Sequence, residues 1–97
     1  MKLEIFESYT EAVCKKMGVS QDELFSKSKD RYITDARALL FALCDRRGMR
    51  KTAIQRLCNM RGAGISYTAI TNSIRRNTRI SEDDDYIRLM EKIENNV

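Results

Sequence analysis

Cationic side chains occupy every second position between residues 27 and 31 of this chain. Lys27, Lys29 and Arg31 alternate along a run without a helical pattern, and Arg37 lies one turn inside the helix predicted to follow. A loop with this spacing can lay several cations along a phosphate backbone or into a narrow minor groove. These residues are therefore candidates for binding an anionic polymer. The alternative is a solvated basic loop that has no partner.

The basic character extends well beyond this run. Residues 27–79 carry thirteen Lys or Arg against three Asp or Glu, a net charge of +10. Residues 1–26 carry three against five (−2), and residues 80–97 carry two against six (−4). Four further cations, Arg46, Arg47, Arg50 and Lys51, stand between two predicted helices. So much charge on one segment repels itself in a compact fold, which indicates an anionic partner.

A short polar face is predicted on a helix later in the chain. It consists of Ser66, Tyr67, Thr68, Thr71, Asn72 and Arg75. Hydroxyl and amide groups suit base edges in the major groove of DNA, and a threonine or tyrosine carbon surface can touch a thymine methyl group. Arg75, farther along, is better placed for phosphate. The alternatives are an ordinary exposed helix face and, for Tyr67, partial burial against the preceding helix.

Several kinds of site are not indicated. The chain has no histidine, and Cys14, Cys44 and Cys58 are odd in number and form no CxxC pair. Neither a disulfide framework nor a zinc site is therefore predicted. The adjacent carboxylates of residues 83–85 project in different directions from a helix, which argues against a metal site. No nucleophile stands with a base. We expect no catalysis, no metal, no cofactor and no small-molecule substrate.

Length and composition indicate one domain, over residues 1–97. A chain of 97 residues can bury a single core. Its 42% of hydrophobic and 33% of charged residues are typical of a folded globular protein. No apolar run is long enough to cross a bilayer, and the first residues lack the pattern of a secretory signal. We therefore expect a cytoplasmic protein with no membrane partner.

Apolar periodicity predicts an all-α fold of five to six helices around one core. A first helix runs from Leu3 to Met17 and ends at Gly18, and Ser20 with Glu23 forms a capping box for a brief second helix. The run from Lys27 to Tyr32 is predicted to be a loop. A longer central helix then runs to about Arg47, before Gly48. Its inward stripe is Ile33, Ala36, Leu40, Leu43 and Cys44.

Two shorter helices follow and form a helix-turn-helix candidate. The first begins at Thr52 and is broken at residues 61–64, and the second opens at Ile65 or Ser66. Their predicted inward residues are Ala53, Ile54, Leu57 and Cys58, then Ala69, Ile70, Ser73 and Ile74. A last helix starts at Ser81, a good N-cap followed by acidic residues. Its apolar face is Tyr86, Leu89, Met90, Ile93 and Val97.

The phrase SKSKDRYITDAR at residues 26–37, followed by this pair of helices, resembles the C-terminal DNA-binding domain (domain IV) of the bacterial replication initiator DnaA. The resemblance covers nearly the whole chain. It is carried by Val19, Glu23, Leu24, Ser26, Lys27, Ser28, Lys29, Arg31, Ile33, Ala36 and Arg37. It implies a fold of the Trp-repressor class and double-stranded DNA as the ligand. It also implies minor-groove contact by the basic loop, with Lys29 in place of a groove-inserting arginine, and phosphate or base contact by Arg37.

The chain departs from that family at the start of the candidate recognition helix. Residues 65–68 are Ile-Ser-Tyr-Thr where the family has Asp-His-Thr-Thr or Asp-His-Ser-Thr, and Ala38 replaces a glutamine. No ATPase domain or Walker motif is present. We therefore expect a stand-alone relative, a regulator or an accessory factor of replication or of a mobile element. It would bind a sequence other than the initiator's usual box.

A different class of function stays open at this point. The basic face would also suit a protein-interaction module that docks on an acidic partner. The discriminating observation is whether the polar face of residues 67–75 is free or is packed against the acidic last helix. The sequence leaves open the target DNA, the biological process, and whether a homo-oligomer assembles on DNA.

Overall fold

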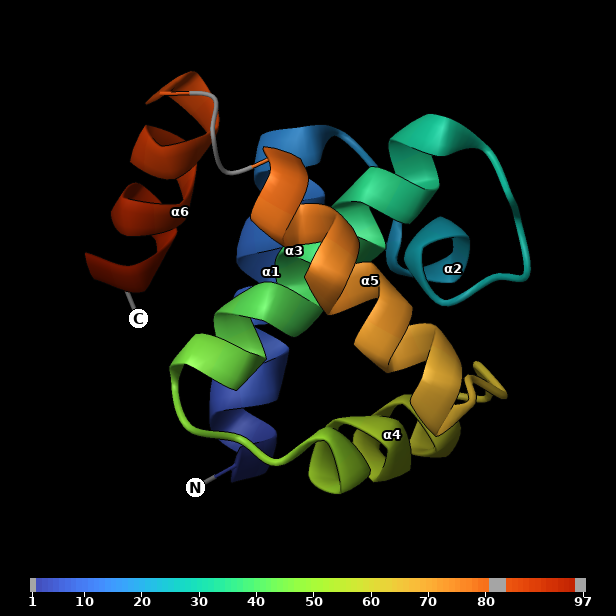
Figure 1. The fold of residues 1–97 in the computed structure, drawn as a ribbon. Helices are drawn as coiled ribbons and strands as arrows, with labels where there is room; N and C mark the ends of the chain where they lie inside the picture. The colour runs from blue at the N-terminus through green and yellow to red at the C-terminus, as the bar shows by residue number, and fades with distance from the viewer. Residues whose placement is uncertain (1, 81–83, 96–97) are drawn as a thin grey trace.

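A computed structural model of the protein describes the backbone of residues 2–80 and 84–95, and the side chains of residues 3–76 and 87–95. Within these residues the chain forms six helices and no strand, which confirms the all-α prediction (Figure 1). They are α1 (Lys2–Met17), α2 (Gln21–Leu24), α3 (Arg31–Arg46), α4 (Lys51–Met60), α5 (Tyr67–Ile80) and α6 (Asp84–Asn95).

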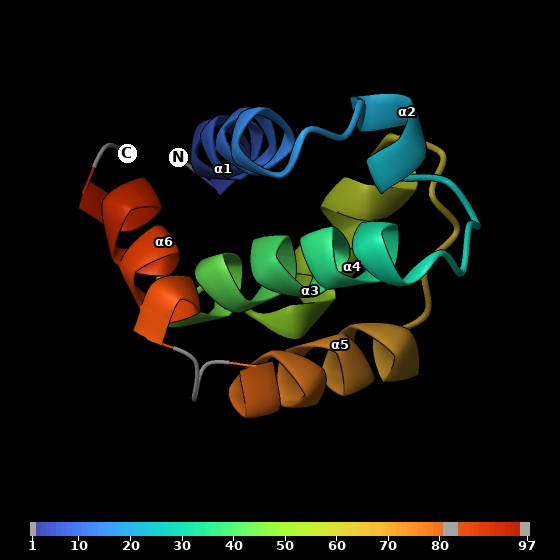
Figure 2. The same cartoon turned by 90° about the horizontal axis from the view of Figure 1, so that it is seen from above.

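Helix α3 lies at the centre and contacts each of the other five helices. Viewed from above, α1 covers one side of α3 and α5 the other, while α2 and α6 lie near its two ends (Figure 2). Every residue from Ala38 to Cys44 is buried, so α3 is apolar around its whole circumference over about two turns. The predicted inward stripe is confirmed and belongs to this larger core.

The first two helices form as their sequences predict. Phe6, Tyr9 and Val13 bury one face of α1, which ends before Gly18, whose φ of 68° is a conformation that suits glycine. The capping box of α2 is present: the Glu23 N–H donates to Ser20 Oγ and the Ser20 N–H donates to Glu23 Oε1, both at 3.1 Å. This short helix closes one end of the core with Leu24.

Two predictions about local structure are wrong. The basic run was expected to be a loop up to Tyr32, but α3 begins at Arg31 because Asp30 caps it: Asp30 Oδ1 accepts a hydrogen bond from the Tyr32 N–H at 2.9 Å. Ala69 was expected to face inward but is exposed, since it lies in the first turn of α5. The predicted cap Ser81, the side chain of Tyr86 and Val97 lie outside the described residues.

The three cysteines are free thiols that fill space in the core. Burial raises the pKa of Cys44 and of Cys58 to about 12. Burial also raises the pKa of Cys14, with a further contribution from the charge of Glu23. Across residues 2–80 and 84–95, no three His, Cys, Asp or Glu side chains cluster as metal ligands would, and no helix has the length and apolar character needed to cross a bilayer.

Ile70 is the most deeply buried of the described α5 side chains, and Ile74 packs beside it against the core. Among the described side chains of α5, only Ile70 is fully buried. We predict that Ile70→Ala lowers the free energy of unfolding by about 2–4 kcal/mol, because it leaves a cavity. Met60→Ala, at a side chain 67% exposed on α4, is the control and should change it by less than about 0.5 kcal/mol. Urea denaturation followed by circular dichroism measures both. Equal effects would contradict this docking.

Candidate nucleic-acid interface

The loop between α2 and α3 is shaped by short-range hydrogen bonds. Ser26 Oγ donates to the Glu23 carbonyl at 2.6 Å and accepts from the Ser28 N–H at 3.2 Å. Ser28 Oγ accepts from the Asp30 N–H at 3.2 Å, and Asp30 then caps α3. Every second residue of the loop therefore bonds to the backbone. These bonds give a segment without regular structure a defined course.

Lys27 and Lys29 lie between these anchors, and Arg31 follows the last of them as the first residue of α3. Lys27, Lys29 and Arg31 are exposed, and none of their side chains has an ion pair or hydrogen bond within the described part of the protein. The residues that hold the loop and the residues that carry its charge therefore alternate along the chain. The three cations are therefore exposed on a backbone whose course is set by hydrogen bonds.

Arg37 fastens this loop to α3. Its Nε donates to the Leu24 carbonyl at 2.8 Å and its Nη2 donates to the Ser28 carbonyl at 2.9 Å. Partial burial lowers the pKa of the guanidinium from its ordinary value of 12.5, and it remains charged at neutral pH. The structure thus gives Arg37 a positioning role. The contact with DNA expected from the sequence stays a prediction.

Most of the other cations fall into two groups. Arg46, Lys51, Arg61 and Arg76 form ion pairs with Glu94, Asp45, Glu7 and Asp35 at 3.2, 3.7, 3.0 and 2.8 Å respectively. Apart from Arg37, which binds carbonyls, the cations without such a partner among the described side chains of residues 27–76 are Lys27, Lys29, Arg31, Arg47, Arg50, Arg56 and Arg75. Each of the three acidic residues of this segment has a partner. Asp35 and Asp45 form ion pairs, and Asp30 caps α3. The loop is the only place in this segment where three successive cations stay unpaired.

The polar face of α5 is open. Tyr67 is 48% exposed, and Thr68, Asn72 and Arg75 are also exposed. The partial burial of Tyr67 that the sequence left open therefore extends to about half of its surface. Thr71 is half-buried and its hydroxyl donates to the Tyr67 carbonyl at 3.1 Å, which leaves its oxygen free to accept and its methyl group free to pack.

Side-chain hydrogen bonds hold both the start of α5 and the connection that precedes it. Ser66 Oγ accepts a hydrogen bond from the Ala69 N–H at 3.1 Å and so caps the helix. The preceding connection, residues 61–66, is tied down by Arg61, which bonds to Gln21 Oε1 and Glu7 Oε1, both at 3.0 Å. In Figures 1 and 2 this connection, the start of α5 and the α2–α3 loop all lie on the right-hand side of the molecule.

Arg50 and Lys51 do not lie on the side that carries the α2–α3 loop and the start of α5. Both stand at the start of α4, which lies at the bottom of the molecule in Figure 1, well away from the α2–α3 loop. Lys51 pairs with Asp45, whereas Arg50 is exposed and provides no side-chain cap for α4. Their predicted contact with DNA would need a partner that extends along α4.

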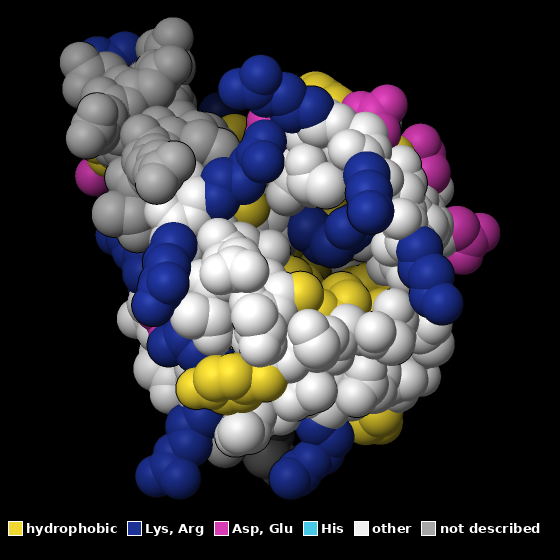
Figure 3. All heavy atoms as spheres, turned by 45° about the vertical axis from the view of Figure 1, so that its right-hand side comes forward, with side chains coloured by type: hydrophobic (Ala, Val, Ile, Leu, Met, Phe, Trp, Pro, Cys, Tyr) yellow, Lys and Arg dark blue, Asp and Glu magenta, His cyan; other side chains and the backbone are white. Residues whose placement is uncertain are grey.

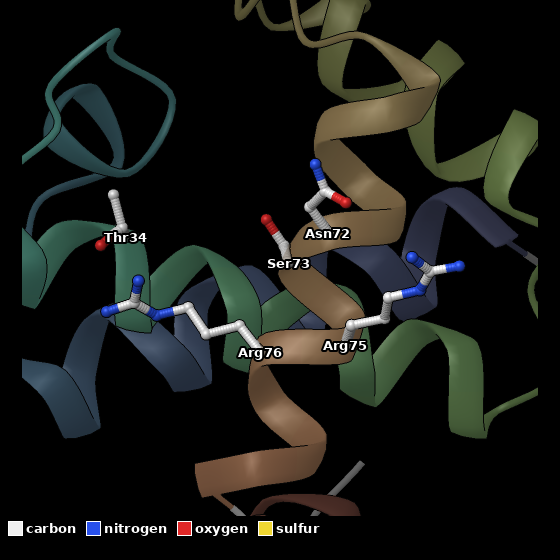
Figure 4. Close-up of a pocket in the computed structure, with 5 residues that line it drawn as sticks. All are labelled: Thr34, Asn72, Ser73, Arg75 and Arg76. Atoms are coloured by element: carbon white, nitrogen blue, oxygen red, sulfur yellow. The ribbon is translucent and has the colours of Figure 1, made fainter.

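The face that carries α5 is basic and hollowed. Figure 3 shows Lys and Arg side chains spread over it around a depression with hydrophobic atoms at its floor, while Asp and Glu gather at one edge. One cavity of about 540 Å³ is lined by Thr34, Asn72, Ser73, Arg75 and Arg76, from the start of α3 and the middle of α5 (Figure 4). It lies between the first turn of α3 and α5, and two residues of the polar face, Asn72 and Arg75, help to line it.

Sequence reasoning missed Thr34 and Arg76 as members of this site. Neither is among the predicted site residues, and the sequence predicts Ser73 to face inward. The helical spacing of Asn72, Ser73 and Arg76 was visible in the sequence. Their meeting with the first turn of α3 was not, because it depends on how α5 crosses α3.

No protein-family model, curated protein or solved structure matches this chain. Fold and site together define a small all-helical domain that presents an unpaired basic loop and an exposed polar helix face on one side.

The positioning role of Arg37 can be tested directly. Arg37→Ala should lower the free energy of unfolding by about 1–3 kcal/mol, because two carbonyls lose a charged donor. It should also speed amide hydrogen exchange in residues 25–30 relative to the rest of the chain. Lys29→Ala is the matched control, since its side chain has no partner within the described residues. Unchanged loop exchange in Arg37→Ala would contradict this role.

Proposed function

We propose that this protein is a sequence-selective module that binds double-stranded DNA. The α2–α3 loop, through Lys27, Lys29 and Arg31, clamps the minor groove and the phosphate backbone. The polar face of α5, from Ser66 to Arg75, enters the adjacent major groove as the second helix of a helix-turn-helix. The module acts without catalysis, as a regulator or as an accessory factor of replication.

The observation that carries this proposal is the unpaired state of the loop cations. Four other cations of the basic segment have ion-pair partners, and Arg37 is bound to carbonyls. The loop instead holds three exposed charges together by means of its own serine and aspartate hydrogen bonds. Phosphate groups would neutralise these charges and release counterions, which is the main source of affinity for DNA.

The open face of α5 favours DNA over docking on an acidic protein. Helix α6 packs against α1 and α3, and Arg46 binds its Glu94. Tyr67, Thr68 and Asn72 remain exposed, as entry into a groove requires.

The resemblance to the DNA-binding domain of the replication initiator supports the same proposal. The phrase SKSKDRYITDAR occupies the α2–α3 loop and the start of α3, where that family keeps its DNA clamp. The altered residues 65–68 lie at the start of α5 and would change the sequence that is bound. We therefore propose a divergent relative with its own DNA target.

The dependence of DNA affinity on salt tests this proposal. Five to eight phosphate contacts predict a slope of log K against log salt of roughly −4 to −7. The double substitution Lys29→Ala with Arg31→Ala should weaken binding to every duplex and make the slope shallower by about 2. Fluorescence anisotropy with mixed duplexes measures both quantities.

The matched control removes one Lys and one Arg from another part of the molecule. Arg88 and Lys92 are exposed on α6, which lies away from the α2–α3 loop in Figures 1 and 2. Arg88→Ala with Lys92→Ala should leave the slope nearly unchanged. A flat salt response of the wild type, or equal effects of the two double variants, would refute the proposed clamp.

Sequence preference should depend on α5 and not on the loop. Selection from a random pool of duplexes identifies the bound sequence. Tyr67→Ala and Thr71→Ala are then expected to change the free-energy difference between that sequence and a scrambled one by about 1–3 kcal/mol. Lys29→Ala should leave this difference nearly unchanged. If all three variants lose affinity equally on both duplexes, the assignment of α5 to the major groove is wrong.

A further inference from the structure

The proposed complex requires a place on the protein surface for one backbone of the DNA. If the α2–α3 loop lies in the minor groove and α5 lies in the adjacent major groove, one DNA backbone must pass between them. The surface between the loop and the outer face of α5 holds the cavity that is lined by Thr34 of α3 and by Asn72, Ser73, Arg75 and Arg76 of α5. Its volume of about 540 Å³ leaves room for a phosphate group.

The lining of this cavity suits an oxyanion. Figure 4 shows Arg76 reaching from α5 across the cavity toward Thr34, with Ser73 and Asn72 on the same side of the helix. A guanidinium, a hydroxyl and an amide can all donate hydrogen bonds to a phosphate. Arg75 also lines the cavity, but its side chain leaves α5 on the side opposite to Arg76 and does not reach toward Thr34 (Figure 4).

Arg76 is held over the cavity by a single carboxylate oxygen. Its Nε and Nη2 lie 2.9 and 2.8 Å from Oδ1 of Asp35, one turn inside α3. Its side chain is 43% exposed. The pair therefore fixes the direction of Arg76 while Nη1 stays available to another acceptor, and an exposed pair of this kind contributes little to stability.

We propose that this cavity seats one phosphate of the DNA backbone, with Arg76 as the principal donor and Ser73 and Asn72 as supporting donors. Asp35 orients Arg76 in the free protein and competes with the phosphate for it. This inference rests on the proposed DNA binding and adds to it a specific subsite. Binding of DNA would then exchange the carboxylate of Asp35 for a phosphate oxygen.

Neutralising single phosphates in the selected duplex tests the subsite. A methylphosphonate placed at successive linkages should weaken wild-type binding on the order of tenfold at one or two adjacent linkages that Arg76 contacts. Arg76→Ala should bind less tightly and should lose its sensitivity at those linkages only. Arg88→Ala removes one arginine charge from α6, away from the cavity, and should keep that sensitivity.

A second control separates phosphate binding from the structural effect of the ion pair. Asp35→Asn breaks the same pair but keeps Arg76, so it should bind DNA as tightly as wild type or more tightly, with the same sensitive linkages. If Asp35→Asn weakens binding as much as Arg76→Ala, the pair is structural and the subsite is refuted. The subsite is also refuted if Arg76→Ala keeps the wild-type pattern while wild type binds DNA. A wild type that binds no duplex refutes the proposed function as well.

Discussion

The complete burial of one stretch of α3 is the constraint on which the rest of the structure depends. Because Ala38–Cys44 are buried on every side, neighbouring helices must cover the whole circumference of α3. Rotating α3 would expose apolar surface at a cost of about 25 cal/mol per Å². Its first turns are thereby fixed, and they carry Arg31, Thr34, Asp35 and Arg37 to the candidate interface. The precision of the site thus derives from the core and not from the loop alone.

Arginines then fasten the irregular segments to this core. Arg37 holds the α2–α3 loop through two carbonyls, and Arg61 holds the α4–α5 connection through Glu7 and Gln21. A guanidinium suits this purpose because its planar set of donors reaches several acceptors at once. These two segments frame the candidate interface, so arginines build the site, while Lys27, Lys29 and Arg31 supply its unpaired charge.

The sequence predicted the all-helical fold, because the apolar spacing of each segment and the capping signals at Gly18 and Ser20 are local properties. It placed Lys27 and Lys29 in a loop, as observed, but missed that α3 already begins at Arg31, since it gave no weight to Asp30 as a cap. The sequence does not predict the different roles of Arg37, Arg75 and Arg76. All three are arginines in basic surroundings, and only the packing of α3 against α2 and α5 decides which of them meets a carbonyl, a carboxylate or open solvent.

The acidic ends and the basic middle of the sequence are partly paired with each other in the folded protein. The acidic flanking segments neutralise part of the basic segment, because Glu7 and Glu94 pair with Arg61 and Arg46. Neither reaches the α2–α3 loop. Repulsion between exposed like charges costs only about 1 kcal/mol at 4 Å in water, and less at greater separation. The free protein can therefore tolerate three unpaired loop cations, and the same charges would attract a dense row of phosphates strongly.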